Sequence, residues 1–127
     1  MEKSSQEILK ILIVDDAKLM RNMIKNTLQS HHVHCTILEA ADGETAVNIV
    51  KQEKPQLITM DITMEGKDGL EAVKEIMNLD QAAKIIMVTS MGQEIMLKEC
   101  IRAGAMEYIM KPFTEERLMS AINSALE

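Results

Sequence analysis

The chain of 127 residues carries a net charge of −6, with 46% apolar and 27% charged residues, which is typical of one globular domain that buries about two thirds of its unfolded surface. Lys and Arg form no cluster, so direct binding to nucleic acid is not expected. No apolar stretch approaches the roughly 20 residues of a membrane span and residues 1–6 are polar, unlike a signal peptide. We therefore expect a cytoplasmic protein with a flexible tail over residues 1–8.

Short apolar runs alternate with helix-like patterns along the chain. Strands are predicted over residues 10–14, 36–40, 57–60, 84–88 and 106–110. Helices are predicted over residues 17–30, from the Asp42-Gly43 turn to near Pro55, after an N-cap at Asp68, over residues 93–103, and after an N-cap at Thr114. Crossovers of this length predict an α/β fold in which helices cover both faces of a parallel sheet. Residues 1–127 are expected to form this single domain, with nothing left over for an output domain.

Charged residues stand where three of the apolar runs stop. The run 11–14 is followed by Asp15 and Asp16, the run 57–60 by Asp61, and the run 108–110 by Lys111. Ligands of parallel sheets collect at the carboxyl ends of the strands. Three carboxylates and one ammonium group are therefore expected to share one small site. That set suits a magnesium ion and a phosphoryl group.

Four segments extend this pattern into a family resemblance. In chain order they read LIVDDAKLMR, LITMDITMEGKDG, IIMVTSMGQ and AGAMEYIMKPF. Together they resemble the receiver domain of bacterial two-component response regulators, and most of all its single-domain chemotaxis members. The resemblance runs from about Ile11 to the end of the chain. It implies a flavodoxin-like, doubly wound (βα)5 sheet of five parallel strands in the order 2-1-3-4-5.

The resemblance also implies how the acidic residues divide their work. Asp61 would be the phosphoacceptor, a covalent role known for carboxylates. Asp16 and Asp61 would bind Mg²⁺ directly, with Mn²⁺ as a substitute, while Asp15 would act mostly through water. The backbone carbonyl of Thr63 would supply one more ligand. A protein of this kind is a signalling switch that catalyses its own phosphorylation and dephosphorylation, not an enzyme acting on other substrates.

Two further residues would contact the phosphoryl group in this family. Lys111 would pair with Asp61 before phosphorylation and with a phosphoryl oxygen afterwards. Its peptide bond to Pro112 is expected to be cis, by the same resemblance. Thr89 ends the fourth strand, where its hydroxyl can donate to the phosphoryl group and then move toward it.

The switch and the partner face follow from the same likeness. Tyr108 would be the aromatic ring that turns inward when Thr89 moves. The partner face would comprise helix 93–103, the fifth strand and the last helix, with Met96, Leu97 and Tyr108 as contacts. A helix cannot bury three consecutive apolar residues on one face, so at least one of residues 95–97 is expected to reach solvent.

Some positions depart from the family pattern or point elsewhere. Glu65 stands where the family usually has Pro, and neither Thr63 nor Met91 carries a carboxylate or amide that could orient an attacking water. The sequence therefore leaves the phosphate lifetime open. A soft metal could bind the cluster of His31, His32, His34 and Cys35, but a solvated loop is the favoured interpretation. The thiols of Cys35 and Cys100 are both expected to be reduced.

The sequence ranks several functions. The leading one is a monomeric chemotaxis regulator that takes phosphate from a chemotaxis-type histidine kinase and docks on a flagellar motor switch protein, with a phosphatase as a further partner. A phosphorelay shuttle and a receiver cut from a longer regulator stay open as alternatives. A magnesium-dependent phosphohydrolase would need a substrate-binding insertion that the short loops lack. A flavin-binding protein would need a phosphate-binding loop where Asp15 and Asp16 stand.

Overall fold

A computed structural model describes residues 8–127 of the chain. The flexible tail expected over residues 1–8 lies outside the described residues, except for the exposed Ile8. Among residues 8–127, no helix has the length and apolar character needed to cross a membrane.

Five strands alternate with five helices, as the sequence predicted. The strands are β1 (Leu9–Val14), β2 (Cys35–Ala40), β3 (Leu57–Asp61), β4 (Lys84–Thr89) and β5 (Glu107–Met110). The helices are α1 (Lys18–Ser30), α2 (Gly43–Glu53), α3 (Gly69–Leu79), α4 (Glu94–Ala103) and α5 (Glu115–Leu126). Each predicted strand is confirmed, with bounds that differ by a single residue.

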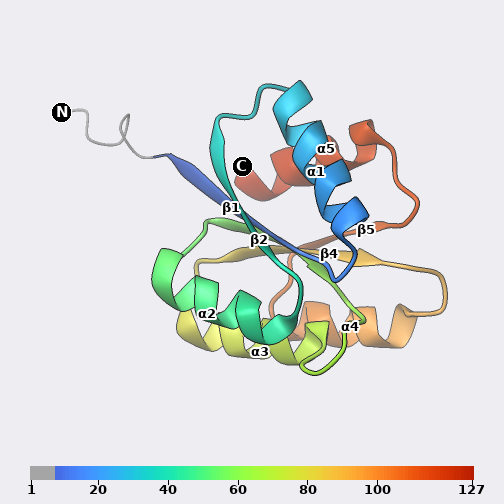
Figure 1. Cartoon of the computed structure of the whole chain (residues 1–127). Coiled ribbons are helices and arrows are strands. Elements are labelled where there is room, and N and C mark those ends of the chain that lie inside the picture. Colours follow the sequence, from blue (N-terminus) through green and yellow to red (C-terminus); the bar gives the residue numbers. More distant parts are fainter. Residues whose placement is uncertain (1–7) are drawn as a thin grey trace.

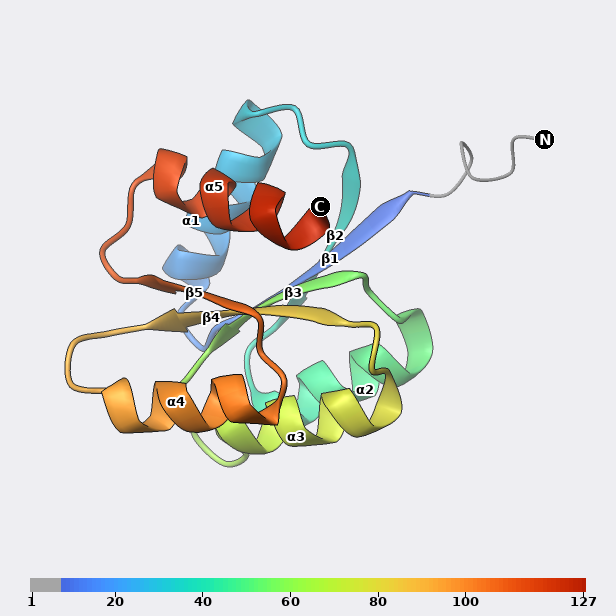
Figure 2. The same ribbon diagram turned by 180° about the vertical axis from the view of Figure 1, so that it is seen from behind.

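The strands form one parallel sheet in the order β2-β1-β3-β4-β5. This confirms the doubly wound fold and the strand order that the family resemblance implied. Helices α1 and α5 cover one face of the sheet, and α2, α3 and α4 cover the other (Figures 1 and 2). The central strands are therefore covered on both sides, which explains why β1 and β3 read as continuous apolar runs rather than alternating ones.

Each face of the sheet has its own apolar core. Met60 and Ile76 belong to the core under α2, α3 and α4, whereas Ile13 and Leu118 belong to the core under α1 and α5. One polar side chain is sealed inside the sheet. The hydroxyl of Thr59 is fully buried and has no hydrogen-bond partner among residues 8–127.

Two predicted helix caps are confirmed. The Asp68 carboxylate accepts a hydrogen bond from the Glu71 N–H (2.9 Å). The Glu71 carboxylate in turn accepts one from the Asp68 N–H (3.2 Å), which completes a capping box. Thr114 accepts from the Arg117 N–H (3.0 Å). In α1, the i, i+3, i+4 spacing predicts an apolar face that includes Met23 with Ile24, Thr27 and Leu28, but this is wrong at Met23, which is 44% exposed.

Candidate functional site

The register of the sheet brings the site residues to one level. Val14 of β1 pairs with Met60 of β3, so the next residues, Asp15 and Asp61, leave the sheet side by side. On the other side of β3, Asp61 pairs with Val88 of β4, and Thr89 follows it. The carboxyl ends of three neighbouring strands therefore share one edge, and the sequence prediction of a convergent site is confirmed.

The three aspartates converge as predicted. Asp15, Asp16 and Asp61 each offer a carboxylate oxygen, and these oxygens lie within 4.8 Å of one another. Asp15 and Asp61 are buried, while Asp16 is exposed at the rim. Among residues 8–127, no other set of three His, Cys, Asp or Glu side chains meets in this way.

Burial makes ionised Asp61 costly in the absence of a cation. Burial first, and then the charge of nearby Asp15, raise the pKa of Asp61 from 3.8 to about 6, although Lys111 acts in the opposite direction. The Asp61 carboxylate is thus held close to two other carboxylates, and the charge of Lys111 offsets the resulting cost only in part. Oxygen ligands of this kind are what Mg²⁺ prefers, so the donor set fits that ion.

Lys111 supplies the compensating charge. Its Nζ donates to Asp15 Oδ2 (3.1 Å) and lies 3.5 Å from Asp61 Oδ1. Burial alone would lower the pKa of Lys111, but the hydrogen bond to Asp15 and the charge of Asp61 outweigh it and raise that pKa. The expected pair with Asp61 is present, and the shorter contact is with Asp15. The Lys111-Pro112 bond is cis, as expected.

Asp15 is held on both oxygens. Its Oδ1 accepts from the Ala17 N–H (2.9 Å) while Oδ2 accepts from Lys111. Arg21 fixes the same turn by donating to the Asp15 carbonyl (2.7 Å) and to Glu39 (2.9 Å). With both oxygens already engaged, Asp15 is suited to orienting the site, and Asp16 and Asp61 have the freer oxygens.

The Thr89 hydroxyl points to the loop that follows β4. It donates to Gln93 Oε1 (3.1 Å) and lies 3.4 Å from the Ser90 carbonyl. The Gln93 side-chain amide donates in turn to the Thr63 hydroxyl on the loop after β3. The side chains of Thr89, Gln93 and Thr63 therefore link two loops at the site.

The start of α3 lies close against the end of β3. The Gly69 N–H donates to the Ile62 carbonyl (2.8 Å). A methyl group at residue 69 would lie 2.5 Å from the Asp61 carbonyl oxygen and 2.8 Å from the Ile62 Cα. Only glycine permits this approach, because the obstructing atoms belong to the backbone.

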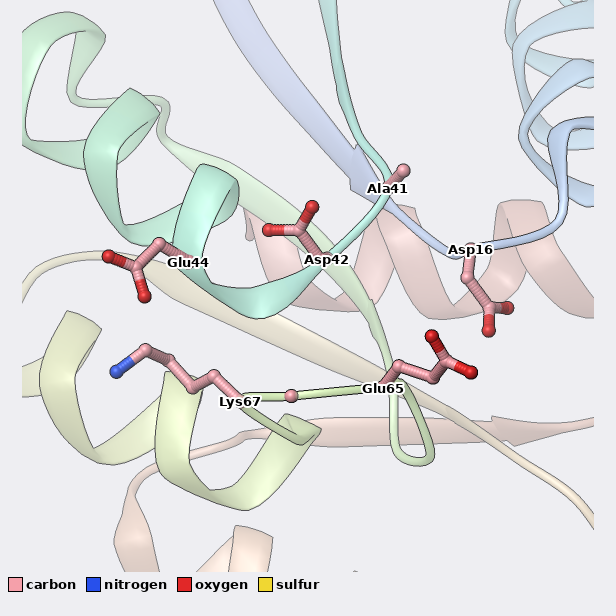
Figure 3. A pocket seen from close by; sticks show the side chains of 7 residues that line it. Asp16, Ala41, Asp42, Glu44, Glu65 and Lys67 are labelled. Carbon is pink, nitrogen blue, oxygen red and sulfur yellow. The ribbon is translucent and has the colours of Figure 1, made fainter.

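An open cavity of about 470 Å³ adjoins the acidic site. Asp16 and Glu65 stand at one end with their carboxylates turned toward each other, and Glu44 and Lys67 line the other end (Figure 3). Lys67 forms an ion pair with Glu75 of α3. Glu65, at the position where the family usually has Pro, thus places a further carboxylate beside Asp16.

The surface around α4 and β5 differs in detail from the prediction. Ile95 is the side chain of the apolar triplet that reaches solvent, at 79% exposure. Met96 and Leu97 are half-buried and pack against the core, since their side of α4 faces the sheet. Tyr108 is 41% exposed.

The His and Cys ligand atoms of residues 31–35 do not converge as a group of three. His31, His32 and His34 are exposed, and the Nε2 of His31 lies 3.2 Å from a Glu115 oxygen. Cys35 begins β2, and Cys100 is buried in the core, where burial raises its pKa to about 11. Both cysteines are free, as expected.

Sequence reasoning missed the role of Gln93, which it treated only as the start of a helix. A signal was present, because Ser90 and Gln93 have the Ser-x-x-Gln spacing of a capping box. In the structure the Ser90 N–H donates to Gln93 Oε1 (2.7 Å). The Gln93 side chain makes this half of the motif and also contacts Thr89 and Thr63, whereas α4 has no side-chain capping bond.

Known proteins resemble this chain in both sequence and fold. Residues 11–123 match the family model for the response regulator receiver domain. The chain is 47% identical to the chemotaxis protein CheY of Bacillus subtilis, over 92% of this chain and 97% of that protein. It is 45% identical to the chemotaxis protein CheY of Thermotoga maritima, over 90% and 94%. A CheY-like receiver domain from Methanospirillum hungatei superposes with a TM-score of 0.87 at 28% identity, over 94% of each chain.

The matched segment spans all five strands and reaches into the last helix, and it includes every predicted site residue. The chain therefore belongs to the response regulator receiver family. Its likeness to the two chemotaxis proteins extends over nearly the whole length of each, which is the pattern of the single-domain, CheY-type members.

Proposed function

We propose that the protein is a phosphorylation-activated response regulator whose phosphoacceptor is Asp61. The observation that carries this proposal is the meeting of Asp15, Asp16 and Asp61 oxygens within 4.8 Å of one another, with Lys111 Nζ 3.5 Å from Asp61 Oδ1. A carboxylate nucleophile beside a cation is suited to phosphoryl transfer, in which positioning and charge compensation supply most of the catalysis.

In the transfer, an Asp61 oxygen forms a bond to phosphorus as the bond to the donor's leaving group breaks, which leaves an aspartyl phosphate. Lys111 lies where it can follow the charge from the carboxylate to the phosphoryl oxygens. The hydroxyl of Thr89, one residue beyond the level of Asp61, can donate to the same oxygens after a rotation. Thr89 and Lys111 would thus stabilise the product as well as the transition state.

The acidic group would hold Mg²⁺, with Mn²⁺ as a substitute, through Asp16, Asp61 and the Thr63 carbonyl, while Asp15 supports the ligands. When bound, the ion supplies positive charge that offsets the three carboxylates and the incoming phosphate. The raised pKa of Asp61 supports this assignment, since it shows that the protein's own cations only partly compensate the site.

Chemotaxis is the pathway that the relatives favour. Both chemotaxis proteins CheY match nearly the full chain, so we propose a chemotaxis-type histidine kinase as phosphodonor and a flagellar motor switch protein as output partner, with a phosphatase ending the signal. The single receiver domain would act in the cytoplasm as a monomer. Tyr108 would turn inward on activation, and α4, β5 and α5 would form the partner face, with Ile95 its most exposed apolar residue.

A phosphorylation assay tests the central assignment. The protein is incubated with a small phosphodonor and Mg²⁺, and intact mass is measured with and without the metal. One added phosphoryl group is expected on the native protein and on the control variant Asp80→Asn. The Asp80 carboxylate accepts a hydrogen bond from the Ala82 N–H in a loop. No added phosphoryl group is expected on Asp61→Asn, and an undiminished adduct on that variant would refute the assignment.

A binding assay separates the output functions. The protein is loaded with beryllofluoride, a phosphoryl mimic, and its affinity for a motor switch protein and for a histidine phosphotransfer protein is compared with that of the unloaded form. Activation-dependent binding to the motor protein, weakened by Ile95→Ala, supports chemotaxis. Preferential binding of the loaded protein to the phosphotransfer protein, without motor binding, would identify a relay shuttle instead.

A further inference from the structure

The Gln93 side chain is engaged at both of its polar atoms. Its Oε1 accepts from the Thr89 hydroxyl (3.1 Å) and from the Ser90 N–H (2.7 Å), and its Nε2 donates to the Thr63 hydroxyl. These contacts link the end of β4 to the loop after β3. A long, flexible side chain that makes three hydrogen bonds, two of them part-buried, is held in a single orientation.

The contact with Thr89 competes with the proposed contact to phosphate. A threonine hydroxyl has one proton to donate. While that proton is directed at Gln93 Oε1, it cannot also be donated to a phosphoryl oxygen. The two hydrogen bonds of Thr89 are therefore mutually exclusive, and binding of the phosphoryl group must break the one with Gln93.

Gln93 also marks the beginning of α4. Its carbonyl accepts from the Leu97 N–H (2.9 Å), so its backbone is part of the first turn. Its side chain makes no capping bond to that helix and turns back toward β4 instead. Ile95, the most exposed apolar side chain of α4, lies two residues beyond it.

We propose that Gln93 is a positioning residue that holds the Thr89 hydroxyl away from the phosphoryl site in the resting state and couples its release to the first turn of α4. This inference rests on the proposed function of Asp61 and Thr89. Loss of the bond leaves Gln93 Oε1 with one donor fewer, so the orientation of the side chain and of the turn that carries it changes together with the phosphorylation state.

The test measures how tightly beryllofluoride binds in the presence of Mg²⁺, using the ¹⁹F NMR signal of the bound species. Gln93→Met keeps the length of the side chain and removes both polar ends. Because one competing hydrogen bond is lost, we expect beryllofluoride to bind about fivefold more tightly. Gln52→Met, on the exposed face of α2, is the matched control and should bind as the native protein does.

Two further variants separate positioning from packing. Thr63→Val removes the acceptor for Gln93 Nε2 and leaves Oε1 in place, so a gain of about twofold is expected. In a Thr89→Val background there is no hydroxyl to hold, and Gln93→Met should then leave the affinity unchanged. A purely structural role would instead show the same effect with and without the Thr89 hydroxyl.

The outcomes distinguish the two levels of the argument. If the native protein binds no beryllofluoride and takes no phosphoryl group at Asp61, the proposed function fails. If the native protein does both but Gln93→Met matches Gln52→Met, or binds more weakly, then the positioning role of Gln93 is overturned while the function of Asp61 stands.

Discussion

Two buried polar side chains lie two residues apart on β3 and are treated differently by the fold. Thr59, in the middle of the strand, is fully buried, and its hydroxyl meets no partner among residues 8–127. Asp61, at the end of the strand, is 7% exposed and lies among two other carboxylates and a lysine. Burying each of these polar groups costs stability. Only at the strand end, however, can other elements place charged side chains beside the buried group and so form a reactive site.

The largest effect should come from neutralising the strand end. In the unfolded chain Asp61 releases its proton near pH 3.8, and in the folded protein near pH 6. Its stabilising contribution is therefore complete below pH 3.8 and lost as the pH rises through about 6. The difference corresponds to roughly 3 kcal/mol, and Asp61→Asn should stabilise the metal-free protein at pH 7.5 by up to that amount.

Urea unfolding of both proteins from pH 4 to pH 8 checks this expectation. The advantage of Asp61→Asn should shrink as the pH falls below about 6. An advantage that stays constant across the range would show that burial of the Asp61 charge is not its cause.

Removing the cation from the strand end should slow the chemistry. Lys111→Met leaves Asp15 and Asp61 without the ammonium group that now contacts both. We expect autophosphorylation by a small phosphodonor to slow by about 100-fold, the scale of one lost electrostatic stabiliser. Lys51→Met, on the exposed surface of α2, is the control. A rate within twofold of the native rate would exclude Lys111 from the transfer.

Adding a divalent cation should stabilise the folded protein. Mg²⁺ that binds the folded state alone stabilises it by about 1.4 kcal/mol at a concentration ten times its dissociation constant. Thermal unfolding with and without the metal should show this gain in the native protein. Asp16→Asn should lose much of it, because the exposed Asp16 is the proposed rim ligand. An equal gain in that variant would place the ion elsewhere.

The smallest effect is expected in the middle of the strand. Thr59→Val keeps the shape of the side chain and removes the unpaired hydroxyl, so we expect a gain of about 1 kcal/mol. Thr36→Val, on the exposed side of the edge strand β2, should change little. Destabilisation by Thr59→Val would show that its hydroxyl has a partner in solution.

Much of this architecture could be predicted from the sequence because parallel sheets are covered on both faces and so have apolar strands that end abruptly. The runs that stop at Asp15, Asp61 and Lys111 thus marked both the strands and the site. The finer sheet order required the family resemblance. Periodicity alone misplaced Met23 on α1, and it could not tell which member of the 95–97 triplet reaches solvent, since that depends on how α4 is rotated against the sheet.

Gln93 was beyond the reach of such patterns for a different reason. Its three hydrogen bonds join side chains from two loops, and the contact to Thr63 depends on how the β3 and β4 ends come together in space. The short-range contact with Ser90 left a trace in the sequence, but the long-range one did not. A strand end marked by a charged residue is easier to find in a sequence than the side chain that contacts it.

The close approach at Gly69 has a consequence for anyone who wishes to redesign this switch. A single added carbon there would collide with the backbone carbonyl of Asp61, the proposed phosphoacceptor, so a library that randomises the loop after β3 should keep residue 69 fixed. Gly92, by contrast, has open space around its Cα, and its positive φ of 92° makes backbone strain the main obstacle to substitution there. Engineering of response speed or partner choice is therefore better directed to the loop after β4 than to the start of α3.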